Sequence, residues 1–137
     1  MRGADLICAI VALLLLAPIA TAAAEVSEKA QAHFIEAADL LGPAKIFVQA
    51  TPGRSTPAMV RRVNQTWLYL LKVMEQSGAS EDQIGEVVGT VQVYWRKYLD
   101  DPNAYMFVIH KHPSEAEEAI QKGLAVVVED AMKTVGE

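Results

Sequence analysis

Four segments of this chain carry apolar residues at every third or fourth position, the spacing that places side chains on one face of an α-helix. They are residues 25–41, 57–77, 81–100 and 115–135. The spacing predicts an all-α fold: a small bundle of four main helices with one or two short extra helices. The third segment is the most regular, and its apolar positions are Ile84, Val87, Val88, Val91, Trp95, Tyr98 and Leu99.

Glycine and proline mark the ends of the first two segments. Gly42-Pro43 is expected to end the first helix, since glycine suits a helix C-terminus and proline cannot continue the backbone hydrogen bonds. Thr56-Pro57 is expected to open the second helix, with threonine as the N-cap and proline at the first helical position. Gly78 is expected to close it.

The last two segments begin with capping signals. Ser80 with Gln83, and Ser114 with Glu117, have the spacing of a capping box. The short connection before Ser80 predicts that the second and third helices pack as an antiparallel hairpin. Residues 124–128 are apolar on almost every side, so the last helix is expected to be the central and most buried one.

Two short apolar segments, 44–50 and 104–110, lie between prolines and have no clear periodicity. Short helices are favoured, because a lone pair of strands is only marginally stable unless it packs on helices. The alternative is an α+β fold in which these two segments form a two-stranded pair.

The N-terminus resembles an export signal in composition. Met1-Arg2 is followed by an unbroken apolar run from Leu6 to Leu16, then by Pro18 and the small residues 21–24. These are the parts of a secretory signal peptide, and cleavage is expected after Ala24 or Ala22. A membrane anchor is the alternative, although its apolar stretch would need about 20 residues.

Cleavage would leave a single helical domain of residues 25–137, secreted or periplasmic, with no cysteine, because Cys8 departs with the signal. A disulfide framework and a thiol nucleophile are therefore not expected. Of the 71 hydrophobic residues that make up the 52%, 19 lie in the removed segment. We expect no membrane contact beyond export.

Charge and motifs argue for a non-enzymatic protein. The chain has 12 basic and 17 acidic residues and a formal net charge of -5, which disfavours nucleic-acid binding. It contains no nucleophile elbow, glycine-rich phosphate loop or zinc-protease motif. The expected role is that of a binding protein, an accessory, inhibitor, immunity or chaperone-like factor that acts through another protein. No cofactor is expected.

A basic and aromatic surface is the candidate partner site. Two tyrosines lie off the apolar stripes of the second and third helices, next to arginine and lysine, a combination that suits an acidic protein partner. The expected hairpin would bring these residues together. The predicted partner-binding residues are Arg61, Arg62, Tyr69, Tyr94, Arg96 and Lys97.

The alternative function is metal binding. His110 and His112 are two positions apart, so both would point to the same side of an extended segment. Imidazole nitrogens are ligands that zinc and copper prefer. The simpler interpretation, without a metal, is that this segment is a polar loop before the last helix.

Overall fold

The computed structural model describes residues 25–50, 52–101 and 112–136. Within these residues the chain forms four α-helices and one short 3-10 helix, and no strand. In order, they are α3 (Glu28–Ala50), η1 (Pro52–Arg54), α4 (Pro57–Gln76), α5 (Glu81–Asp100) and α6 (His112–Gly136). The all-α bundle predicted from the apolar spacing is confirmed. The predicted signal peptide, residues 1–24, lies outside the described residues.

Helix α3 does not end at Gly42-Pro43 as predicted. It continues to Ala50, with Pro43 inside it. Proline lacks the N–H that would bond the Asp39 carbonyl, which disfavours an internal position. The helix nevertheless continues, and Gly42, Pro43 and Ala44 are all buried. Tertiary packing commonly overrides local helix preference in this way.

The short segment 44–50 therefore forms the last turns of α3. The alternative of a two-stranded pair is wrong for this segment, and its other half, 104–110, lies outside the described residues. Ile46, Phe47 and Val48 are buried in succession, so this end of α3 is covered on more than one side. A helix covered in this way shows no single apolar stripe, which is why the spacing here was ambiguous.

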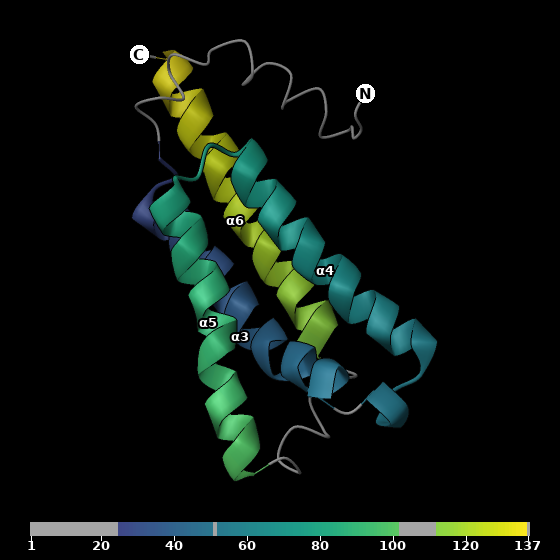
Figure 1. Ribbon diagram of the computed structural model, residues 1–137. Helices are drawn as coiled ribbons and strands as arrows, with labels where there is room; N and C mark the ends of the chain where they lie inside the picture. Colours follow the sequence, from purple (N-terminus) through teal and green to yellow (C-terminus); the bar gives the residue numbers. More distant parts are fainter. Residues whose placement is uncertain (1–24, 51, 102–111, 137) are drawn as a thin grey trace.

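Helix α3, and not the last helix, is central. It packs against α4, α5 and α6. A smaller contact joins α4 to α6. Figure 1 shows α3 behind the other helices, with α6 between α4 and α5. Helix α6 is buried near its start and middle but exposed at its end, where Met132 and Val135 face solvent.

The predicted antiparallel hairpin of α4 and α5 is not a packed unit. The two helices are joined by the short connection 77–80 but touch very little, and they diverge from it (Figure 1). Each packs on α3 instead. Helix α4 packs on α3 and α6, and α5 packs on α3, so the short connection between α4 and α5 does not bring these two helices into contact along their length.

The local signals at the helix ends are largely confirmed. Thr56 caps α4 by accepting a hydrogen bond from the Met59 N–H at 3.2 Å. Ser80 and Gln83 form both hydrogen bonds of a capping box at the start of α5. Gly78 follows α4 with a φ of 91°, a left-handed conformation that favours glycine.

Two apolar clusters form the core of the described part. The larger one joins α3, α4, α5 and α6 around Phe34, Leu41, Leu70, Met74 and Ile120. The smaller one surrounds the C-terminal half of α3. None of the described helices is long and apolar enough to cross a membrane.

Candidate functional site

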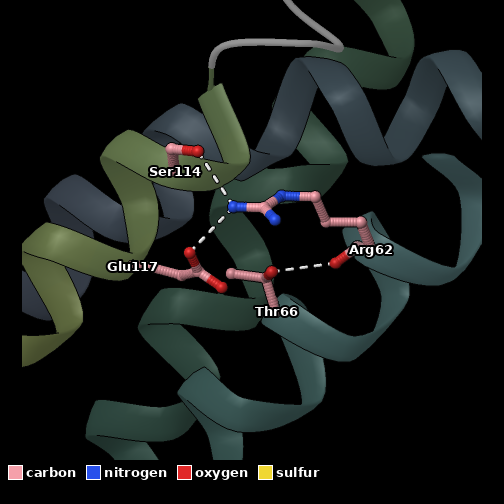
Figure 2. A network of polar contacts seen from close by, with 4 residues as sticks. All are labelled: Arg62, Thr66, Ser114 and Glu117. Atoms are coloured by element: carbon pink, nitrogen blue, oxygen red, sulfur yellow. Dashed lines mark hydrogen bonds and ion pairs between the residues drawn. The ribbon is translucent and has the colours of Figure 1, made fainter. Parts of the chain in front are cut away.

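A polar network joins the start of α6 to α4. The Arg62 Nη2 atom donates to the Ser114 hydroxyl and to Glu117 Oε1, both at 2.9 Å (Figure 2). On α4 itself, the Thr66 hydroxyl donates to the Arg62 carbonyl oxygen at 2.8 Å. Both Arg62 and Glu117 keep about half of their side-chain surface in contact with solvent.

This network corrects the predicted capping box at Ser114. Helix α6 already begins at His112, so Ser114 and Glu117 lie inside its first turns. Their side chains receive hydrogen bonds from Arg62 across the helix interface. Local spacing along the chain does not reveal an arginine on a neighbouring helix.

We expect the Arg62–Glu117 pair to contribute little to stability. In a double-mutant cycle of Arg62→Ala and Glu117→Ala, the coupling energy should be about 0.5 kcal/mol, because half-exposed ion pairs are screened by water. Urea unfolding of the four proteins measures it, and the coupling should shrink in high salt. A coupling energy of several kcal/mol would contradict this expectation.

Both predicted tyrosines are half-buried and face neighbouring helices. The Tyr69 hydroxyl accepts a hydrogen bond from the side chain of Gln121 on α6. The Tyr94 hydroxyl donates to Asp39 Oδ1 at 3.2 Å, and its ring covers Gly42 so closely that a Cβ there would lie 2.4 Å from Cδ2. Tyrosines placed in this way seal the edges of the core with hydrated hydroxyl groups.

The six predicted partner-binding residues therefore do not form one surface. Arg62 and Tyr69 face α6, and Tyr94 faces α3. Arg61, Arg96 and Lys97 are exposed, with the Lys97 ammonium 5.0 Å from the centre of the Tyr94 ring. The predicted surface depended on a packed α4–α5 hairpin, which the structure does not contain.

The outer face of α4 is a candidate site, and Arg61 is the one residue on it that the sequence interpretation predicted to bind a partner. Arg61, Gln65, Leu68 and Lys72 are all exposed and follow one another at helical spacing. Leu68 keeps 63% of its surface exposed between the two bases. Glu75, near the end, is the one acidic residue of this helix. Leu68 lies off the apolar stripe of this helix, and a single leucine at such a position does not by itself predict a binding face.

Two residues predicted in the core of α5 are exposed instead. Trp95 is 46% exposed and Leu99 63% exposed, whereas Tyr98 between them is buried. The rings of Trp95 and Tyr98 stack with their centres 6.0 Å apart. Because α5 packs almost entirely on α3, one flank of its apolar stripe lacks a neighbouring helix in the described part.

Of the predicted metal pair, His112 is described and His110 lies outside the described residues. His112 Nδ1 is 2.9 Å from the Leu40 carbonyl oxygen, which can only accept, so this nitrogen donates. Its Nε2 is 3.8 Å from Glu115 Oε1. No group of three or more potential metal ligands occurs within the described ranges, and zinc or copper binding stays a prediction.

Lys45 is a partly buried base that the sequence interpretation passed over. It lies on α3, and its Nζ donates to Asn64 Oδ1 on α4 at 2.6 Å. Burial penalises the charged ammonium and so holds the pKa of Lys45 below its ordinary value. This residue joins the two helices, and nothing around it indicates a chemical role.

Comparisons of the whole chain find no matching family model, no matching characterised protein and no matching solved structure. The proposed function therefore rests on the sequence and on the described side chains.

Proposed function

We propose that this protein is an exported, non-enzymatic binding protein that acts through an acidic protein partner, in the manner of an accessory, inhibitor, immunity or chaperone-like factor. The partner would bind along the outer face of α4, defined here as Arg61, Gln65, Leu68 and Lys72. This face refines the basic surface predicted from the sequence, of which it keeps Arg61.

The exposure of Leu68 between two bases is the observation that carries the proposal. A lone exposed leucine is common, but this one lies between Arg61 and Lys72 on a helix face without an acid until Glu75. Interfaces combine apolar contact with charged groups that select the partner. A basic face is also unusual on a chain with a net charge of -5.

The expected partner is a protein segment that carries acidic residues around an apolar side chain. Its carboxylates would pair with Arg61 and Lys72, which raises the rate of association and excludes basic partners. Helix α4 lies at the edge of the bundle, beside α6, so a segment can reach this face along its length (Figure 1).

The test is site-specific photocrosslinking in cells that export the protein. A photoreactive phenylalanine at Leu68 should give an adduct whose partner peptide is rich in aspartate and glutamate. The same group at Glu129, an exposed position on α6, should not give this adduct. Charge reversal by Arg61→Glu with Lys72→Glu should abolish it, whereas Arg61→Lys with Lys72→Arg should keep it.

An adduct that survives charge reversal, or that forms equally from both positions, would contradict the proposal. Export is tested separately by the mass of the recovered protein. A chain that begins at Ala23 or Glu25 is expected, since cleavage is predicted after Ala22 or Ala24. Recovery of the chain with its first 22 residues attached would contradict the predicted cleavage.

A further inference from the structure

Val26, just before α3, is fixed to α5 through its backbone. Its N–H donates to Gln83 Oε1 at 3.3 Å, and its carbonyl oxygen accepts from Gln83 Nε2 at 2.8 Å. The Val26 side chain is buried in the larger apolar cluster. Because α3 begins only at Glu28, the attachment of Val26 comes from this contact with another helix and not from a place inside α3.

Gln83 is itself held in place by further hydrogen bonds. Its Oε1 also accepts from the Ser80 N–H at 3.0 Å, within the capping box of α5. Its carbonyl oxygen accepts from Nε2 of Gln31 at 3.0 Å, and the same Nε2 donates to Glu86 Oε1 at 3.2 Å. Gln31 is a buried residue of α3. Release of Val26 therefore requires hydrogen bonds to break, since the Gln83 side chain is not free to follow it.

The two predicted cleavage sites lie just before this contact. They are the Ala22–Ala23 and Ala24–Glu25 bonds, so Val26 is the second residue after the later bond and the fourth after the earlier one. A protease binds the residues on both sides of the bond as an extended segment, through backbone hydrogen bonds. At the Ala24–Glu25 bond this segment includes Val26, whose N–H and carbonyl groups are already bonded to Gln83. The folded chain therefore cannot present this bond without first releasing Val26.

We propose that the contact between Gln83 and Val26 protects the Ala24–Glu25 bond, so that the folded chain is processed at the Ala22–Ala23 bond. This inference rests on the export part of the proposed function, in which a signal peptide is removed, and not on the outer face of α4. Hydrolysis adds one water molecule across the bond and leaves a carboxylate on Ala22 and a free amine on Ala23. The processed chain then keeps three residues before Val26.

A glutamate-specific endopeptidase tests the protection without any signal peptidase. Glu25 is the first glutamate of the chain, and cleavage after it gives a product that begins at Val26. The folded full chain, kept in mild detergent, should be cut slowly at this bond. Gln83→Ala should be cut about tenfold faster, because Val26 loses two hydrogen bonds and cleavage follows the population of the opened form. Mass spectrometry of the products over time measures both rates.

Two controls separate release of Val26 from general loss of stability. Gln92→Ala removes an exposed glutamine from the same helix. Gly42→Ala strains the fold elsewhere, because its Cβ would lie 2.4 Å from the Tyr94 ring. Both variants should be cut after Glu25 within about twofold of the unmodified rate, since opening is local. Equal rates for the unmodified chain and Gln83→Ala, or an equal acceleration by Gly42→Ala, would overturn the proposal.

Purified signal peptidase, added to the same folded chain, tests the choice of bond. The product of the unmodified chain should begin at Ala23, and Gln83→Ala should add a product that begins at Glu25. Circular dichroism confirms that both forms are folded. An unmodified chain cut mainly after Ala24 would refute the proposal. A chain left whole would contradict both the cleavage after Ala22 and the signal peptide of the proposed function, whereas the rates of cleavage after Glu25 would still decide whether Gln83 protects Val26.

Discussion

Replacing Gly123 with leucine is expected to lower the free energy of unfolding by at least about 3 kcal/mol, the largest effect we predict for a single substitution. Gly123 is buried on α6, where α6 packs against α3. A Cβ at this position would lie 2.6 Å from Cε1 of Phe34, and Phe34 is completely buried. The ring cannot move away, so the helices themselves must separate.

A graded series shows whether this close approach is the cause. Gly123→Ala should destabilise less, by about 1 kcal/mol, because the helix-forming preference of alanine offsets part of the clash. Phe34→Leu combined with Gly123→Ala should be more stable than the sum of the two single effects predicts. The control is Ala125→Leu, an exposed position on the same helix, which should change stability by no more than about 0.5 kcal/mol.

Urea unfolding followed by circular dichroism measures all of these variants. If Gly123→Leu unfolds at the same urea concentration as Ala125→Leu, α3 and α6 do not pack as closely as described here. Tyr94 provides a comparison, since its ring lies even closer to a Cβ at Gly42, at 2.4 Å, but is only half-buried. Gly42→Ala should therefore cost less than a leucine at Gly123.

The second large effect is expected at Gln83. Its Nε2 donates to the Val26 carbonyl oxygen at 2.8 Å, and its Oε1 accepts from the N–H groups of Val26 at 3.3 Å and Ser80 at 3.0 Å. One side chain thus closes the capping box of α5 and also attaches the segment before α3. Gln83→Ala should lower the free energy of unfolding by about 2 kcal/mol, since each bond contributes about 1 kcal/mol and water replaces part of the loss.

Gln92→Ala is the matched control, because Gln92 is an exposed glutamine on the same helix. It should change the free energy of unfolding by less than about 0.5 kcal/mol. Hydrogen exchange adds a local measurement: the Val26 amide should exchange faster in Gln83→Ala and at the normal rate in Gln92→Ala. Equal stability and equal exchange in the two variants would show that the attachment contributes nothing.

The candidate sites were only partly predictable. Arg61 was selected from the sequence and is exposed, whereas Leu68 was missed because one off-stripe leucine carries no signal by itself. Trp95 was assigned to the core from its helical position, and the structure exposes it because α5 packs on one side only. Whether a stripe is covered depends on helices far away in the sequence.

Helix formation and most helix ends were determined by the sequence alone. A hydroxyl at Thr56 or Ser80 and a left-handed Gly78 act within a few residues, so their effect is visible in local spacing. Only the tertiary structure decided that α3 passes through Pro43, that it is the central helix, and that Glu117 binds Arg62. The physical reason is the sequence separation of the interacting groups. A cap pairs with backbone groups a few residues away, whereas burial and side-chain pairing depend on segments that the chain brings together only when it folds.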